Sequence, residues 1–297
     1  MTQANGFETG FSLNNVRWTG DYWISVEGYI NTFDINPDGS NVFYISWLNQ
    51  TQAGGAVNNI CTVSLGSKYQ LSSNIAMPIR IPSSNLCPAP TKFASALSFH
   101  PNGNILYYST STHFSNTWVN DPFIIPSFFQ PSSNTIILSS GAFLFMSHAP
   151  DTNYSLASSR SIDFGDRTFL GVNRSVPIGF TTAGSSLLGN TRYNTVGGFQ
   201  GILVDRKMTY IISLSGLNIT SNMWLLSKFT VSKPLVGNAI GTRPKYDFVN
   251  IYPLFPANMK PTLGSGIAVD RENVQYLFIN ALINSKWTIC KFQLRAT

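Results

Sequence analysis

Charged side chains are scarce in this chain of 297 residues: Asp, Glu, Lys and Arg make up only 11% of it. An average globular domain carries about 25%. The 19 basic and 13 acidic residues leave a formal net charge of +6, and the basic ones are scattered, with Arg243 and Lys245 as the densest local pair. Because electrostatic binding to nucleic acid needs a continuous basic stripe, we expect no nucleic-acid partner.

Cysteine is also rare, and the count of three is odd. An odd, small number argues against a disulfide framework. Cys61 and Cys290 occur in similar local sequences, so we interpret both as small apolar packing residues. Cys87 lies in the proline-rich segment 82–90 and is the one candidate for a reactive thiol. A Cys61–Cys87 disulfide is the minor alternative.

Long apolar runs are missing. No stretch approaches the ~18 apolar residues of a transmembrane helix, so we expect no membrane insertion. Residues 1–10 are polar and lack the apolar run of a secretory signal, so we also expect no signal peptide.

Motifs of known chemistry are absent too. The chain has no G-x-S-x-G elbow, no phosphate-binding glycine loop and no Cys-x-x-Cys pair. Its three histidines, His100, His113 and His148, do not stand at zinc-ligand spacing. We therefore predict no catalytic, cofactor-binding or metal-binding residues, no cofactor, and a protein that is not an enzyme.

What the chain does have is internal repetition. Gly201-Ile-Leu-Val-Asp-Arg206 recurs as Gly266-Ile-Ala-Val-Asp-Arg271, and Trp224-Leu-Leu-Ser-Lys-Phe229 recurs as Trp287-Thr-Ile-Cys-Lys-Phe292. A repeat of this period indicates an array of supersecondary units that bury their apolar faces against one another.

Two earlier units share the pattern less literally. Residues 33–39 (Phe-Asp-Ile-Asn-Pro-Asp-Gly) and 97–103 (Leu-Ser-Phe-His-Pro-Asn-Gly) each precede an aromatic strand. Pro-Asp-Gly and Pro-Asn-Gly favour turns. Asn36, His100, Asp205 and Asp270 are then equivalent turn positions, and the wide middle gap leaves room for one more unit at residues 143–157.

A third strand can be traced in the same units. Trp118 and Phe123 have the spacing of Trp224 and Phe229, and residues 60–65 align with 289–294. We expect the repeated tryptophans to pack between units. Candidates for a fourth strand are residues 76–82, 135–138 and 246–254.

Four antiparallel strands per unit, repeated radially, are typical of a β-propeller blade. The last unit runs out of chain after its third strand, and residues 16–26 lack a turn partner. We therefore predict an all-β fold, a single β-propeller domain over residues 1–297. Its five four-stranded blades lie at 31–92, 93–140, 141–198, 199–262 and 263–297 plus 9–30. N-terminal strand pairing closes the last blade and removes a sheet edge; six or seven shorter blades are the alternative.

The units resemble the Pro-Asp-Gly repeats of β-propeller proteins of the kind common in phage and bacterial surface proteins. Residues 34–65 match best, and 95–109 next. This resemblance concerns architecture, because propellers carry many unrelated activities.

Two groups of acidic residues have a functional alternative. Asp34, Asn36, Asp38 and Gly39 match the opening of a calcium loop, but the twelfth position, which should carry a carboxylate, is Ile45. We interpret them as a turn. Asp205 and Asp270 resemble paired catalytic carboxylates, but their identical contexts favour a repeated turn cap or ion pair.

These observations predict a non-enzymatic structural or adhesion protein of a virion, of phage type. Its rim loops would contact other virion proteins or a host receptor, including a glycan receptor, as part of a larger assembly. The candidate rim contact residues are Trp47, Phe128 and Phe129. The alternatives are a secreted, extracellular lectin-like propeller and a propeller hydrolase with a metal in its central channel.

Overall fold

The computed structural model describes residues 13–26, 28–47, 58–72, 78–82, 92–99, 106–112, 123–124, 145–148, 154–158, 168–173, 185–190, 199–204, 210–215, 222–230, 246–270 and 275–294. Within these ranges the regular structure is antiparallel β-sheet, with short 3-10 turns at η1 (Leu13–Asn15), η5 (Tyr252–Leu254) and η6 (Ala257–Met259). The protein is all-β, as predicted.

The described strands form five sheets, numbered here in chain order. Sheet 1 contains β2 (Tyr29–Ile35), β3 (Asn41–Trp47), β4 (Asn58–Ser64) and β5 (Ile79–Pro82). Sheet 2 contains β6 (Lys92–Phe99), β7 (Leu106–Thr112) and β8 (Phe123–Ile124). Sheet 3 contains β9 (Phe145–His148), β10 (Tyr154–Ser158), β11 (Thr168–Asn173) and β12 (Ser185–Asn190). Sheet 4 contains β13 (Phe199–Val204), β14 (Tyr210–Ser215), β15 (Leu225–Thr230) and β16 (Tyr246–Asn250). Sheet 5 contains β17 (Pro261–Val269), β18 (Tyr276–Ile283), β19 (Lys286–Gln293) and β1 (Arg17–Ile24).

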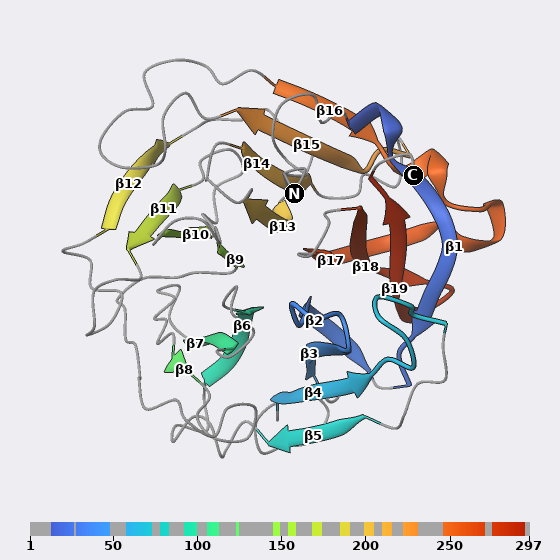
Figure 1. Ribbon diagram of the computed structural model, residues 1–297, viewed down its shortest axis with the longest axis horizontal. Coiled ribbons are helices and arrows are strands. Elements are labelled where there is room, and N and C mark those ends of the chain that lie inside the picture. Colours follow the sequence, from blue (N-terminus) through green and yellow to red (C-terminus); the bar gives the residue numbers. More distant parts are fainter. Residues whose placement is uncertain are drawn as a thin grey trace, which may run out of the picture.

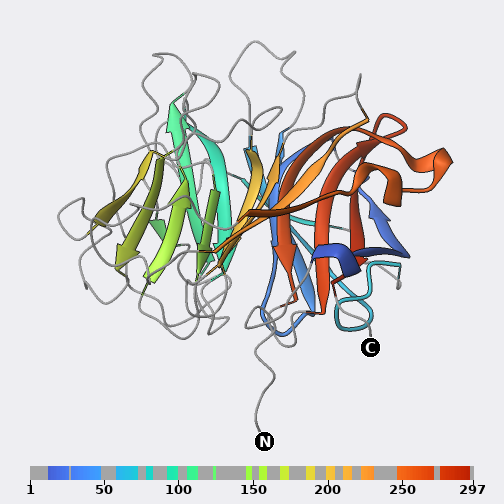
Figure 2. The same ribbon diagram turned by 90° about the horizontal axis from the view of Figure 1, so that it is seen from above.

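The innermost strand of each sheet lies next to a common centre; in sheet 5 this strand is β17, not β1. β2 packs against β6, β6 against β9, β9 against β13, β13 against β17, and β17 against β2. Figure 1 shows the five sheets arranged about this centre, with β5, β8, β12, β16 and β1 outermost, and Figure 2 shows the same arrangement from above. The repeats therefore bury their apolar faces between neighbouring sheets.

The N-terminal strand completes the last sheet, as predicted. β1 pairs antiparallel with β19, and the strand order of sheet 5 is β1-β19-β18-β17. Strands from the two ends of the chain thus lie side by side, and β19 is not left as an open edge.

Strand register confirms the alignment of the repeats. Ile35 pairs with Val42 at the end of sheet 1's first hairpin, as Val269 pairs with Leu277 in sheet 5. The same register places Cys61 and Cys290 at equivalent positions, and both are buried thiols. The alternative of a Cys61–Cys87 disulfide is therefore not adopted; Cys87 lies outside the described residues.

A β-bulge recurs in the first strand of four sheets. The register shifts between Ile30 and Thr32 in β2, between Ala94 and Ala96 in β6, between Phe199 and Gly201 in β13, and between Gly264 and Ile267 in β17. A bulge bends its strand and increases the local twist. The repeated glycine of the Gly-Ile-x-Val-Asp motif lies at this bulge.

One strand alignment is wrong. Tyr108 of β7 pairs with Phe123, and Tyr108 matches Tyr44 of sheet 1, which pairs with Cys61. Phe123 is therefore equivalent to Cys61 and Cys290. The sequence alignment places it two residues later in the strand, at the position of Phe229 and Phe292. Side chains two apart share a face, so the apolar pattern does not distinguish the two registers.

Other strand predictions are confirmed where the chain is described. The unit predicted at residues 143–157 is matched by β9 and β10, which pair antiparallel at the start of sheet 3. β5 and β16 lie within the predicted fourth strands 76–82 and 246–254, although the latter ends at Asn250 and continues into η5. Trp118 and residues 135–138 lie outside the described part.

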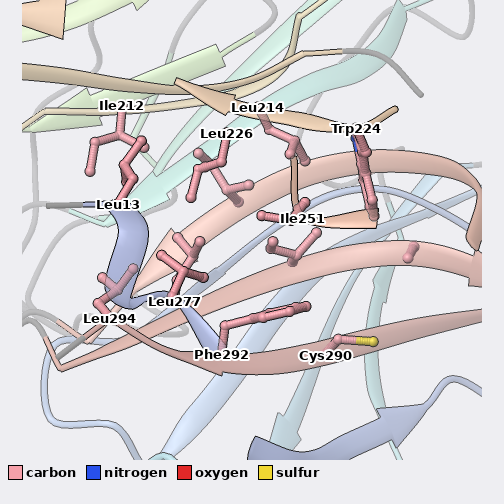
Figure 3. Close-up of a cluster of buried hydrophobic side chains, with 14 of the residues drawn as sticks. Leu13, Ile212, Leu214, Trp224, Leu226, Ile251, Leu277, Cys290, Phe292 and Leu294 are labelled. Atoms are coloured by element: carbon pink, nitrogen blue, oxygen red, sulfur yellow. The ribbon is translucent and has the colours of Figure 1, made fainter. Parts of the chain in front are cut away.

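Two apolar cores fill the spaces on either side of sheet 5. The first, between sheets 4 and 5, contains Trp224, Leu226 and Phe292 among others (Figure 3). The second, between sheets 5 and 1, contains Trp23 and Trp287. The expectation that Trp224 and Trp287 pack between units is confirmed.

The turn between β2 and β3 is built as predicted. Gly39 donates its N–H to the carbonyl of Asn36 at 2.8 Å and has φ +75°, which suits glycine. The Asn36 side chain accepts from the amide of Asn41, and Asp38 accepts from Ser40. These polar side chains form hydrogen bonds within the turn, which supports the turn interpretation over the calcium loop.

Candidate functional site

The most exposed apolar group in the described part of the chain lies on β1 and just beyond it. Tyr22, Ile24 and Val26 are 36%, 41% and 71% exposed, whereas Trp23 and Ser25 between them are buried. This alternation follows from the period of two in an extended strand. β1 is the outermost strand of sheet 5 (Figure 1). The three exposed side chains therefore form a row on the outer wall, which we call the β1 row.

Aromatic packing holds one end of the β1 row in place. The ring of Trp18 stacks on Tyr22 with centroids 6.2 Å apart. On its other side it contacts Phe255 at 5.5 Å and Phe292 at 5.4 Å, at the edge of the core between sheets 4 and 5. These ring contacts anchor the Tyr22 end of the row at the core between sheets 4 and 5. Contiguous exposed apolar patches are typical of contact surfaces.

The far end of the row lies at one end of sheets 5 and 1. The connection from β1 to β2 runs there, Pro261 pairs with Ile283, and Tyr29 pairs with Trp47 at the end of β3. We call this end the linker rim. Leu263, 49% exposed, also lies there.

Of the predicted contact residues, only the backbone of Trp47 is described, and it lies at the linker rim. The side chain of Trp47 and the residues Phe128 and Phe129 lie outside the described part. Their predicted contacts stay predictions.

A buried ion pair lies between sheets 5 and 1, on the inner side of β1. Lys291 Nζ lies 3.4 Å from Asp21 Oδ2, and the two side chains are only 4% and 12% exposed. The ammonium group also lies 4.0 Å from the ring centroid of Tyr276, within the range of a cation–π contact.

The backbone of β1 bulges out over Lys291. Trp18 pairs with Phe292 and Tyr22 with Cys290, so three residues of β1 face Lys291 alone. The hydroxyl of Thr19 donates to the Lys291 carbonyl at 2.8 Å and accepts from the Asp21 amide at 3.2 Å. Side chains thus replace the regular ladder at this point.

The Asp21 carboxylate also reaches sheet 1. Its Oδ2 accepts from the amide of Leu71 at 3.0 Å, and its Oδ1 from the amide of Ser72 at 2.7 Å. One carboxylate therefore links β1, β19 and the segment that follows β4.

Burial governs the charge state of this cluster. Desolvation lowers the pKa of Lys291, and the nearby charges of Asp21 and Asp270, with the Asp21 hydrogen bond, offset part of that effect. A lysine of lowered pKa can serve as a base or a nucleophile. Here the ammonium is enclosed between two sheets, so its geometry is that of a structural ion pair.

The structure supports the turn-cap interpretation of Asp270. This residue is buried, its amide donates to the carbonyl of Tyr276, and its carboxylate accepts from the amide of Gln275 at 3.4 Å. Asp205, His100 and His113 lie outside the described residues.

Among the described residues, no group of three or more His, Cys, Asp or Glu side chains is placed to hold a metal ion. Nor does that part of the chain contain a helix of the length and apolar character needed to cross a bilayer.

Sequence reasoning missed Asp21 and Lys291 as partners. The signal that was available is the lysine shared by the two repeated Trp-x-x-x-Lys-Phe segments, at Lys228 and Lys291. It also missed the β1 row, although Tyr22, Ile24 and Val26 alternate with Trp23 and Ser25 in the sequence.

No family model and no curated protein matches the chain. Solved structures do match it. One is hydrazine synthase of Kuenenia stuttgartiensis, with 12% identity and a TM-score of 0.44 over 89% of this chain and 77% of that chain. Another is the β-propeller domain of Cps50 (Swd1) from Myceliophteria thermophila, with 9% identity and a TM-score of 0.39 over 88% and 82% of the two chains. A third is prolyl oligopeptidase B from Galerina marginata, with 10% identity and a TM-score of 0.45 over 92% and 42%. All three TM-scores lie below 0.5.

Proposed function

We propose that the chain forms a single five-bladed β-propeller, with the blades at 31–92, 93–140, 141–198, 199–262 and 263–297 plus 9–30. The five sheets, the ring of first strands and the pairing of β1 with β19 support this proposal. A high-resolution experimental map tests it directly. Six or seven separate sheets around the axis would contradict it.

The function that this scaffold supports best is a non-enzymatic one. We propose a structural or adhesion protein of a virion, of phage type, that binds a neighbouring protein through its outer wall. The β1 row is the observation that carries the contact role, because it presents Tyr22, Ile24 and Val26 along and just beyond the outermost strand of sheet 5. The virion assignment rests on the low charge of the chain and on the resemblance of its repeats to phage propellers.

The chemistry of the β1 row favours a protein partner. Its three side chains are uncharged, and an apolar core with a polar rim is the usual anatomy of a protein–protein interface. We propose a neighbouring virion protein as the partner, with a host receptor engaged by rim loops that include Trp47, Phe128 and Phe129.

Incorporation into particles tests this function. Ile24→Glu combined with Val26→Glu places two charges in the β1 row, and we expect the variant to be lost from purified particles. Phe248→Glu is the matched control, because Phe248 is 52% exposed on β16, the outer strand of another sheet. It should be incorporated normally.

Each result has a defined meaning when both variants unfold at the wild-type midpoint. Loss of the double variant alone supports the β1 row as the contact surface. Normal incorporation of the double variant contradicts that role for the row. Absence of the wild-type protein from every particle fraction contradicts the virion function itself.

A further inference from the structure

β1 differs from the other described strands in how it is attached. It reaches sheet 5 from the opposite end of the chain, and like the outermost strands of the other sheets it has a neighbour on one side only, β19. Its ladder is interrupted between Trp18 and Tyr22, where the bulge carries Gly20 at φ +85°. Backbone pairing alone therefore holds β1 less firmly than it holds the central strands β18 and β19.

Side chains compensate at the interruption. Within the bulge, Thr19 binds the Lys291 carbonyl and Asp21 binds the Lys291 ammonium. Asp21 also accepts from the amides of Leu71 and Ser72 in sheet 1. Removing the Asp21 carboxylate would therefore remove a partner from three groups at the same time: the buried Lys291 ammonium and the amides of Leu71 and Ser72.

We propose that β1 is a releasable strap, and that the carboxylate of Asp21 fastens it to both the last and the first sheet. Release of β1 would free the segment at residues 71–72 in the same step, because one carboxylate holds both. It would also uncover the edge of β19, so the strap controls whether the ring of sheets is closed.

The charges around the fastening make Asp21 the dominant member. Of the described groups, Asp21 from β1, Asp270 from the end of β17 and the ring of Tyr276 from β18 face Lys291. Within this described set, Lys291 is the one ammonium beside two carboxylates. Loss of Asp21 would leave the buried Lys291 ammonium without its ion-pair partner, whereas loss of Lys291 leaves Asp21 with its two amide donors.

Native-state hydrogen exchange of the full chain tests the strap. In the wild type, we expect peptides covering β1 and residues 71–72 to exchange together, and faster than β18. Asp21→Asn should speed both by roughly a hundredfold to several thousandfold, the opening expected when one partner of a buried pair is removed, and leave β18 unchanged. Asp38→Asn is the matched control, because Asp38 is an exposed acid whose side chain binds only within its own turn.

A double variant separates the ion pair from general damage. Lys291→Met removes the buried cation, so Asp21→Asn with Lys291→Met should exchange more slowly in β1 than Asp21→Asn alone. The strap is refuted if Asp21→Asn leaves β1 exchange within threefold of the wild type, or if β18 accelerates equally. If Asp21→Asn fails to fold, hydrogen exchange of the wild type tests the proposal. Different opening free energies for β1 and for residues 71–72 would overturn it.

Discussion

Replacing Gly201 with alanine should force sheets 4 and 5 apart. A Cβ at this position would lie 2.7 Å from the backbone nitrogen of Ile267, 2.8 Å from its Cγ1 and 3.1 Å from the carbonyl carbon of Gly266. Ordinary contact begins at 3.4 Å, so β13 and β17 must separate by about 0.7 Å. Overpacking by one methyl group costs about 1–3 kcal/mol. We expect about 2–3 kcal/mol, because a backbone atom cannot rotate away as a side chain can.

Urea unfolding followed by tryptophan fluorescence measures this loss. Gly20→Ala is the matched control, since Gly20 has φ +85° but nothing within 4 Å of the added Cβ. It should lose only the backbone contribution, about 1 kcal/mol. The steric explanation fails if Gly201→Ala unfolds within 0.5 kcal/mol of the wild type, or proves milder than Gly20→Ala.

Three further predictions concern the interfaces between sheets. Trp224→Ala should lose about 3–5 kcal/mol of unfolding free energy, because this fully buried ring stacks on Phe255 at 5.7 Å; a loss below 1 kcal/mol in urea unfolding would contradict its place in the core. Asp34→Ala should lose about 1–3 kcal/mol, because the carboxylate accepts from the buried amide of Phe99 in the next sheet at 2.7 Å, and Asp34→Asn should lose less; equal losses would contradict the role of that bond. Lys291→Met should lose less unfolding free energy at pH 7 than the about 3–5 kcal/mol typical of a broken buried pair, because the Asp21 carboxylate keeps its two amide donors, Leu71 and Ser72. The folded pKa of Lys291 is lowered, so the unfolded chain binds more protons between that pKa and the ordinary lysine value. The wild type should therefore gain stability relative to Lys291→Met as the pH rises through this alkaline interval, and a gain on acidification instead would refute the assignment.

Local repetition made the larger part of the fold predictable. The motif that begins at Gly201 and Gly266 identified two first strands, and the unpaired apolar residues 16–26 predicted the strand that completes sheet 5. Register then confirmed the equivalence of Cys61 and Cys290. These signals come from residues close together in the sequence. The alternation of a strand and the residue preferences of a turn are also set over a few residues, so they can be recognised without the structure.

The sequence was less informative where partners are distant or where two registers bury the same face. Phe123 was misplaced by two residues because the apolar pattern repeats every two. The Asp21–Lys291 pair joins opposite ends of the chain, and no period links them. Asp34 was read as part of a turn, but its carboxylate also accepts from Phe99 in the next sheet, a contact that depends on how sheets pack.

The buried ion pair is best explained by the register of β1. β18 and β19 are joined by a tight turn at Asn284 and Ser285, both with positive φ, and such a turn fixes their register. No turn joins β1 to β19, so side chains must specify their alignment. A slip of one residue would turn Trp23 outward and would carry Asp21 away from Lys291. Buried polar pairs contribute more to register than to net stability in the best-attested cases, and a strand that arrives from the far end of the chain is where that contribution is needed.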